Sequence, residues 1–325
     1  MKKAKKIFTT LLPLLLGVFL VIYAYNKFTP AQIDEIKTHL SQANWLYISL
    51  SCVFTIIALT SRAYRWKYPL NHMGYNPKAY NRLMAVSAGY LLNFTIPRSG
   101  EVSRAVLLQK YDKVPFDKGF GSIIAERLVD LLCLLLLVSL VLLLQFQQLY
   151  GFLQRVVPLE KLLITSALLL IIGIAFIGFI YYGKHRIFVA IREKAKGLVE
   201  GLLSLFKMPN RGPFLLHTLI IWGAYVATFY FGTKSIEATT DLSLGVILVT
   251  FVVGSLAVSF TNGGLGAFPL MIAEVLLLYG VSETAGTTFG WILWASQTVI
   301  LIVAGALSFL LFPLLNKNIQ QLKKQ

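Results

Sequence analysis

The chain has 325 residues, of which 57% are hydrophobic and only 14% are charged, a composition that excludes an ordinary soluble globular domain. Long apolar segments recur along it, so the sequence predicts an all-α polytopic membrane protein without room for a separate soluble domain. The net charge of +16 does not indicate nucleic-acid binding, because the Lys and Arg residues lie in loops between apolar segments, where membrane orientation explains them.

The N-terminal segment predicts a transmembrane helix that is not cleaved. Four lysines precede an apolar run from Ile7 to about Tyr25, and no small-residue cleavage site follows it. Tyr23 and Tyr25 are typical of an interfacial belt. We therefore expect the N-terminus on the cytoplasmic side, residues 26–44 outside, and a second span from about Trp45 to Ser61 that returns to the cytoplasm.

A short charged segment follows this second span. The loop that begins at Arg62 is basic, and the next apolar stretch, Leu83–Ile96, has fourteen residues. At about 1.5 Å per residue this is too short to cross a hydrocarbon core of about 30 Å. Because the residues after it are again basic, we predict a re-entrant hairpin that turns near Asn93–Gly100 and returns to the cytoplasmic side.

The remaining apolar segments complete six spans and a second hairpin. Further full spans are predicted at Ile123–Leu144, Lys161–Tyr182, Pro213–Phe231 and Gly286–Pro313. The stretch Leu242–Phe260 is interrupted by the sequence TNGGLGAFP before a twelve-residue apolar piece, Ala267–Leu278, which fits a second broken hairpin entering from outside. Under this topology most of the 30 Lys and Arg residues and the C-terminus are cytoplasmic. Crossings by the short segments remain the alternative.

The two interrupted segments are similar to each other at a constant offset of 166 residues. This offset aligns three identical residues of each segment: Phe94, Thr95 and Gly100 with Phe260, Thr261 and Gly266. Three spans and one hairpin make an odd number of crossings. We therefore expect halves of roughly 1–150 and 155–315 in opposite orientation, within one integral membrane domain covering residues 1–325. Inverted repeats with broken helices are typical of transporters.

Charged and glycine-rich residues gather at both breaks. Each break predicts a helix N-terminus, near Ser99 and near Ala267, where unpaired N–H groups and a partial positive charge favour anions. Guanidinium groups suited to phosphate are expected from Arg98, Arg104 and Arg127. The carboxylates that could orient those arginines or meet a cationic headgroup are Glu101, Glu126 and Asp130. The predicted hinge or helix-breaking residues are Pro97, Gly100, Asn262, Gly263, Gly264, Gly266 and Pro269.

The same charges allow a structural interpretation. Glu126 and Asp130 are four residues apart and so share a helix face, where a buried ion-pair network could join the first hairpin to the following span. If the apolar stretch Leu83–Ile96 only reached the membrane interface, the charged residues that follow it would be ordinary snorkelling residues. Glu274 either lines a pore or faces the outer interface. Cys52 and Cys133 lie in apolar spans and the four histidines are scattered, so neither a metal site nor a cofactor is expected.

Three motifs together resemble one known family. They are NFTIPRSGEVSRA (Asn93–Ala105), AERLVD (Ala125–Asp130) and GGLGAFP (Gly263–Pro269). In this order they resemble the lysylphosphatidylglycerol synthase transmembrane-region family, the flippase-like domain also found in multiple peptide resistance factor. The resemblance implies that the charged and glycine residues of these motifs line a lipid-handling cavity. The full synthase continues into a soluble aminoacyl-transferase domain, whereas this chain ends at Gln325, so we expect translocation without lysyl transfer.

These features predict a multi-pass protein of the bacterial inner membrane that is not an enzyme. It would move an anionic or aminoacylated phospholipid, or another lipid-linked headgroup, between leaflets, with membrane lipids as its partners. A second copy of the chain or a separate lipid-modifying enzyme is a further possible partner. Two alternatives stay open. One is a membrane-embedded transferase acting on a lipid-linked substrate, with Glu101, Glu126 or Asp130 as acid–base groups, and the other is a scaffold subunit without transport.

Overall fold

The computed structural model describes residues 15, 18–23, 25–96, 99–147, 178, 182, 189, 208–261 and 263–316. All regular elements in these residues are helices, and four stretches are long and apolar enough to cross a membrane: Trp45–His72, Phe116–Leu144, Arg211–Thr233 and Glu283–Leu315. They coincide with four of the six predicted spans, which confirms the polytopic helical fold. The other two predicted spans, 7–25 and 161–182, lie largely outside the described residues.

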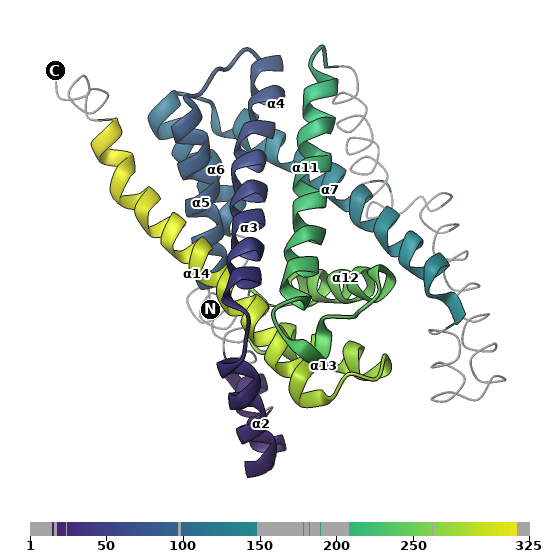
Figure 1. Cartoon of the computed structure of the whole chain (residues 1–325). Coiled ribbons are helices and arrows are strands. Elements are labelled where there is room, and N and C mark those ends of the chain that lie inside the picture. Colours follow the sequence, from purple (N-terminus) through teal and green to yellow (C-terminus); the bar gives the residue numbers. More distant parts are fainter. Residues whose placement is uncertain are drawn as a thin grey trace.

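The described helices follow one another in a simple order (Figure 1). Their bounds are α2 (Pro30–Ser41), α3 (Trp45–Arg65), α4 (Lys67–His72), α5 (Ala79–Thr95), α6 (Ser99–Asp112), α7 (Phe116–Leu144), α11 (Arg211–Thr233), the 3₁₀ turn η1 (Glu237–Thr239), α12 (Leu244–Phe260), α13 (Ala267–Leu278) and α14 (Glu283–Leu315).

Polar side chains define where several of these helices begin. The Asn44 carboxamide accepts from the Leu46 N–H at the start of α3, and Ser243 accepts from the Val246 N–H at the start of α12. Ser282 caps α14 in the same way through the Ala285 N–H. Each cap satisfies a backbone donor that has no partner within its own helix.

The second span extends further than the sequence predicts. It was expected to end at Ser61 and to give way to a basic loop, but α3 remains helical through Arg65. Arg62 and Arg65 are buried there, with 3% and 0% of their surface exposed. The expectation was wrong because it treated these arginines as solvated loop charges, whereas buried carboxylates of α7 neutralise them.

The first short apolar segment forms a helical hairpin of α5 and α6. The Lys78 backbone N–H, before α5, donates to Asp112 Oδ1 at the end of α6 over 3.1 Å, so the hairpin returns to its starting end. The helices approach so closely that a Cβ on Gly100 would overlap the Gly89 carbonyl oxygen. At the turn, the Gly100 N–H donates to Asn93 Oδ1 over 2.7 Å, which caps the new helix.

The second interrupted segment forms the corresponding hairpin of α12 and α13. Its helices pack against each other, and α13 begins at Ala267 as predicted. The connection contains three glycines with positive φ: 66° at Gly263, 80° at Gly264 and 71° at Gly266. Such φ values are costly for residues that carry a Cβ, so the glycines are what let the chain turn within so few residues.

The contacts at the two ends of the bundle fix the helix directions. The Asn44 N–H donates to the Ser235 carbonyl over 2.8 Å, which brings the start of α3 beside the end of α11. These two helices therefore run antiparallel and pack side by side (Figure 1). At the other end, the carboxamides of Asn81 and Asn316 exchange two hydrogen bonds, joining the start of α5 to the end of α14.

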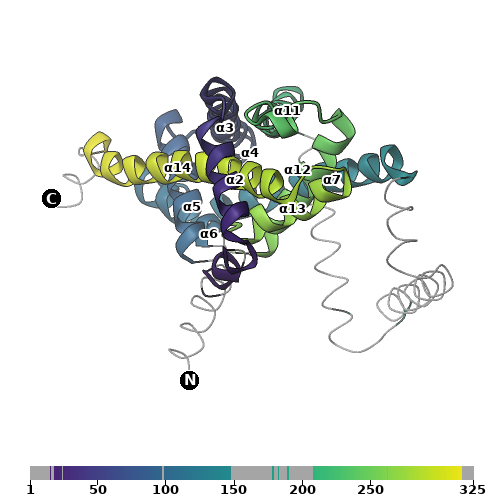
Figure 2. The same cartoon turned by 60° about the horizontal axis from the view of Figure 1, so that its bottom comes forward.

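The element order of the first half recurs in the second. Helices α3, α5, α6 and α7 begin at residues 45, 79, 99 and 116, and helices α11, α12, α13 and α14 begin at residues 211, 244, 267 and 283. Each pair of starts is 165 to 168 residues apart, close to the offset read from the two breaks. Helix α14 packs against both α5 and α13 and so connects the two hairpins (Figure 2).

Candidate functional site

The tips of the two hairpins meet. Two Phe94 ring atoms, at the end of α5, would lie 2.5 Å from a Cβ placed on Gly263, so only glycine fits beneath this ring. Trp294 of α14 donates its indole N–H to the Gly263 carbonyl over 2.8 Å. Both α5 and α14 therefore contact the second break at Gly263.

A cavity of about 580 Å³ lies where the tips meet, and its volume is typical of small-molecule sites. Both hairpins and α14 form its wall, with Glu101 and Arg127 as its charged residues. The lining residues are Tyr90, Asn93, Phe94, Glu101, Arg127, Val258, Ser259, Phe260, Thr261, Gly263, Phe268, Trp294, Gln297, Thr298 and Leu301. We call this the tip cavity.

A second cavity of about 410 Å³ adjoins the first, and we call it the arginine cavity. Tyr90, Arg127 and Gln297 line both cavities, so one wall is common to them. The arginine cavity also reaches Arg62 and Asp130. The charged side chain of Arg127 therefore lines both cavities, next to the hairpin tips.

Both cavities also have lining residues that are exposed on the surface of the helical bundle. Phe260 is 85% exposed and Val258 is 42% exposed, although both line the tip cavity. Leu131 of α7, which lines the arginine cavity, is 50% exposed. Among the described residues, the cavities therefore border exposed apolar side chains of α7 and α12.

Asp130 lies at the centre of a buried charge network. Its two carboxylate oxygens accept from Arg62 Nη1 over 2.7 Å and from Arg65 Nη1 over 2.8 Å. Arg62 Nη2 also donates to the Tyr225 hydroxyl over 3.1 Å, and Arg65 Nη1 donates to Thr218 Oγ1 over 3.2 Å. These bonds join α3, α7 and α11 through charged groups that would be very costly to bury unpaired.

Glu126, one turn before Asp130, extends the network to the first hairpin. Its Oε2 accepts from Arg104 Nη2 of α6 over 3.0 Å, and both side chains are almost completely buried. The Arg104 guanidinium lies 4.1 Å above the Trp66 ring, a cation–π contact. The stem of Arg104 crosses Gly89 so closely that a Cβ there would lie 2.9 Å from Arg104 Cγ. Arg104 is therefore held by an ion pair, an aromatic ring and a close backbone contact.

Arg127 and Glu101 form the accessible ion pair of the network. Arg127 Nη2 donates to Glu101 Oε1 over 2.7 Å, and Arg127 Nη1 lies 3.9 Å from Asp130 Oδ2. The Arg127 side chain is 39% exposed, whereas Arg62, Arg65 and Arg104 are buried. In the described part of the network, four arginines face three carboxylates, which leaves one excess positive charge next to the cavities.

Several buried polar atoms of the site have no hydrogen-bond partner among the described residues. On the walls of the cavities these are Glu101 Oε2, Arg62 Nε, Arg127 Nε, Trp222 Nε1 and Gln297 Nε2. Buried polar groups without partners are rare in folded proteins and indicate water, an ion or a ligand. Within the same residues no group of three His, Cys, Asp or Glu side chains could hold a metal ion.

The residues predicted for the site divide into groups in the structure. Glu101, Arg127 and Gly263 line the tip cavity, and Asp130 lines the arginine cavity. Arg104 and Glu126 lie behind them as a buried ion pair that joins α6 to α7. Gly100 lies at the close crossing of α5 and α6, Gly264 packs against Phe268 and Trp294, and Gly266 and Pro269 lie beside Lys27. Pro97, Arg98 and Asn262 lie outside the described residues.

Four residues of the site were not predicted from the sequence. Arg62 and Arg65 were assigned to a loop, although their spacing of three places both on one helix face opposite the Glu126 and Asp130 pair. Tyr90 and Gln297 line both cavities but stand alone among apolar residues. An uncharged polar residue in a membrane span was the only available signal for these two.

Glu274 lies in the second half of α13. Its carboxylate is 3.8 Å from Lys27 Nζ, and Lys27 also donates to Glu283 Oε1 at the start of α14 over 2.5 Å. The hydrogen bond to Glu283 raises the pKa of Lys27. The side chain of Glu274 is 56% exposed, and it forms a charged cluster with Lys27 and Glu283.

Comparisons with known proteins agree with this architecture. The family model described as "Lysylphosphatidylglycerol synthase TM region" matches residues 10–308. A UPF0104 membrane protein of Methanocaldococcus jannaschii is 28% identical over 36% of this chain and 35% of its own length. The glycosyltransferase AglD of Haloferax volcanii is 28% identical over 39% of this chain and 20% of its own length. The chain thus aligns with about a third and a fifth of these relatives, and no solved structure matches it.

Proposed function

Because the chain belongs to the lysylphosphatidylglycerol synthase transmembrane-region family, we propose that it is a flippase-like transporter that moves a lipid headgroup between leaflets. The headgroup would be that of an anionic or aminoacylated phospholipid or another lipid-linked group. One observation carries the proposal: two broken hairpins meet at a cavity of about 580 Å³ that contains a partly exposed arginine. Broken helices that meet around a polar site are typical of transporters.

Arg127 is the residue that would bind the headgroup phosphate. It lines both cavities, it is the most accessible arginine of the network, and its Nε has no partner among the described residues. A guanidinium can offer a second pair of donors to phosphate while it keeps one bond to Glu101. The anchored arginines, Arg62, Arg65 and Arg104, would contribute positive potential rather than direct contacts. Arg98 would join Arg127 if its side chain reaches the same cavity.

The border between the cavities and the lipid-facing surface suits a lipid substrate. A headgroup in the tip cavity could leave its apolar chains among lipid tails beside Phe260 and Val258. This arrangement avoids burying the chains in protein and avoids dragging a charged headgroup through hydrocarbon. The desolvation cost of moving a charge into lipid is about 2.5–3.5 kcal/mol even on the mildest insertion scale.

We further propose that the halves of roughly 1–150 and 155–315 form an inverted repeat within one membrane domain. The constant offset between helix starts and the antiparallel packing of α3 and α11 support this arrangement. The glycines of the second break would act as hinges when the hairpins exchange access between the two sides. The proposal places both termini in the cytoplasm, in the cytoplasmic membrane of a bacterium, with membrane lipids as partners.

A second candidate is a membrane-embedded transferase acting on a lipid-linked substrate. The observation that favours it is the similarity to a protein named glycosyltransferase, although the match covers only 20% of that protein. Glu101 would then be the acid–base candidate, because it lines the tip cavity and has one carboxylate oxygen without a partner among the described residues. A transferase makes and breaks covalent bonds in the lipid, whereas transport leaves the lipid chemically unchanged.

Reconstitution of the full chain into liposomes tests the proposal. Headgroup-labelled phosphatidylglycerol, lysylphosphatidylglycerol and a polyprenyl phosphate lipid would each be followed with a reagent that reacts only at the outer leaflet. We expect protein-dependent exchange of at least one of them, with the lipid recovered chemically unchanged. Recovery of a modified lipid would instead favour the transferase. The absence of exchange for every lipid would contradict transport.

A matched pair of variants locates the exchange in the cavity. Arg127→Gln should slow the exchange of phosphate-bearing lipids about tenfold, because a charge-assisted hydrogen bond contributes roughly 1.5–3 kcal/mol. Lys118→Gln removes a cation from an exposed position on the same helix and should leave the rate unchanged. Equal losses in both variants would indicate a general effect of charge and not binding at Arg127.

A further inference from the structure

Much of the tip cavity's wall is uncharged but polar. Helix α14 contributes Trp294, Gln297, Thr298 and Leu301, which recur at the spacing of a single helix face. Helix α5 contributes Tyr90 and Asn93. The wall therefore combines amides and hydroxyls with aromatic rings.

Some of these polar groups have a fixed direction of hydrogen bonding. The hydroxyls of Ser259 and Thr261 donate to carbonyls of their own helix, at 2.7 and 2.6 Å, so only their lone pairs remain for a ligand. The Gln297 Nε2 is a buried donor without a partner among the described residues, and Glu101 Oε2 is a buried acceptor in the same condition. The wall thus offers both acceptors and a donor, a combination that a ligand with several hydroxyls can satisfy.

The charges of the cavities suit phosphate better than an ammonium. Asp130 accepts from two arginines, and Glu101 accepts from Arg127. The ammonium group of a lysyl headgroup would have to compete with these arginines for the carboxylate of Asp130 or Glu101. A phosphate needs only the excess positive charge that the described network already carries at Arg127.

We infer that the headgroup is a glycosyl phosphate, with its sugar against the α14 wall and its phosphate at Arg127. The sugar hydroxyls meet Gln297 and Glu101, and the apolar faces of the sugar ring pack against aromatic rings such as those of Trp294 and Phe94. The volume of about 580 Å³ accommodates a small sugar with its phosphate. This inference rests on the proposed function and names the substrate class of the same site.

Three lipids in the same liposome assay test the inference. They are a polyprenyl phosphate carrying one hexose, the same polyprenyl phosphate without sugar, and lysylphosphatidylglycerol. Outer-leaflet hexose is oxidised by periodate, bare phosphate is removed by a soluble phosphatase, and the lysyl amine reacts with an impermeant sulfonate reagent. We expect the hexosyl lipid to exchange at least about tenfold faster than the other two, because polar groups built to bind hydroxyls reject analogues that lack them.

The variant Gln297→Leu links the preference to the wall. It should lower exchange of the hexosyl lipid about tenfold and leave exchange of the bare phosphate lipid unchanged, which also shows that the variant is folded. Equal rates for all three lipids, faster exchange of lysylphosphatidylglycerol, or an equal loss for every lipid in Gln297→Leu would overturn the sugar assignment. If no lipid exchanges in the wild-type protein, the proposed function itself fails.

Discussion

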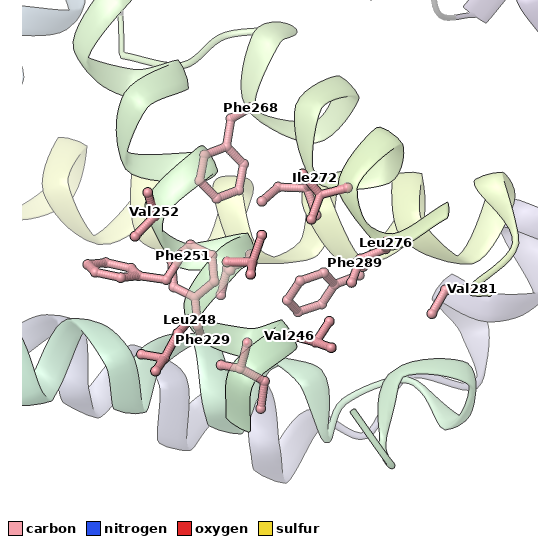
Figure 3. Packing of buried hydrophobic residues seen from close by; sticks show 14 of the residues in the cluster. Phe229, Val246, Leu248, Phe251, Val252, Phe268, Ile272, Leu276, Val281 and Phe289 are labelled. Carbon is pink, nitrogen blue, oxygen red and sulfur yellow. The ribbon is translucent and has the colours of Figure 1, made fainter. Parts of the chain in front are cut away.

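The two hairpins share an arrangement but differ in what holds them. The α5–α6 hairpin is joined to α7 by ion pairs, whereas the α12–α13 hairpin packs in an apolar cluster that includes Phe229, Phe251, Phe268 and Phe289 (Figure 3). The contrast between charged and uncharged side chains is also seen at equivalent positions of the two halves. At the offset of 166 residues, Arg104, Glu126 and Asp130 correspond to Leu270, Ile292 and Ser296.

This difference shows that the hairpin arrangement does not depend on buried charge. The second half builds the same order of helices with apolar side chains, and replacing a buried ion pair by apolar groups often costs no stability. The charges of the first half therefore need another explanation. Their position beside two cavities, with one excess positive charge in the described residues, favours a role in binding.

The largest effect is expected from neutralising Asp130. The substitution Asp130→Asn removes the carboxylate charge that pairs with both buried Arg62 and buried Arg65, and it should lower the free energy of unfolding by roughly 3–5 kcal/mol. Asp117→Asn, at an exposed position on the same helix, is the matched control and should have little effect. Unfolding in detergent by denaturant measures both. Equal stability of the two variants would mean that Asp130 does not hold the first half together.

The next effect concerns the close crossing of α5 and α6. The substitution Gly100→Ala places a methyl group against the Gly89 carbonyl and should lower the free energy of unfolding by about 1–3 kcal/mol. Gly121→Ala, on α7, introduces the same methyl group into open space and serves as the control. Thermal unfolding in detergent gives the comparison. A Gly100→Ala protein as stable as the control would rule out the tight crossing.

A smaller effect is expected at the junction of the two hairpins. Gly263→Ala combines a positive φ of 66°, which costs about 1–2 kcal/mol, with a clash against Phe94. Gly280→Ala has a φ of 82° but faces open space, so it isolates the backbone contribution. The additional loss at Gly263 should be relieved by Phe94→Ala in a double-mutant cycle. If Phe94→Ala gives no relief, the two tips do not touch as described.

The smallest change in stability is expected for the accessible ion pair. Glu101→Gln should change the free energy of unfolding by less than about 1 kcal/mol, because the Arg127 side chain is 39% exposed and solvent screens the pair. The same substitution releases Arg127 and should increase the affinity for phosphate-bearing lipid, measured by equilibrium binding in detergent. A large loss of stability without a gain in affinity would assign the pair a structural role.

The sequence predicted the breaks and the four described spans well, because local signals determine them. Proline and glycine interrupt apolar runs at both turns, and the length of each run decides whether it can cross a membrane. The ion pair between Arg104 and Glu126 also followed from the expected network between the first hairpin and the next span. These features depend on neighbours in the chain or on simple charge matching.

The sequence did not predict the burial of Arg62 and Arg65 or the cavity positions of Tyr90 and Gln297. The partner of both arginines, Asp130, lies 68 and 65 residues away in the chain, and only the tertiary fold brings its side chain within reach of these arginines. The cavity lies beside the contact between the two hairpin tips, and its wall is formed by residues of both hairpins, α7 and α14, so it depends on tertiary packing. Neither property leaves a local pattern in the chain.

Blocking the tip cavity tests the central claim most directly. In a protein with Cys52→Ser and Cys133→Ser, a single cysteine is introduced by Thr298→Cys on the cavity wall or by Gln42→Cys at an exposed control position. A bulky thiol reagent is then attached before lipid exchange is measured in liposomes. We expect labelling at residue 298 to reduce exchange to the level of protein-free vesicles and labelling at residue 42 to leave it unchanged. Undiminished exchange with residue 298 fully labelled would contradict the passage of a headgroup through this cavity.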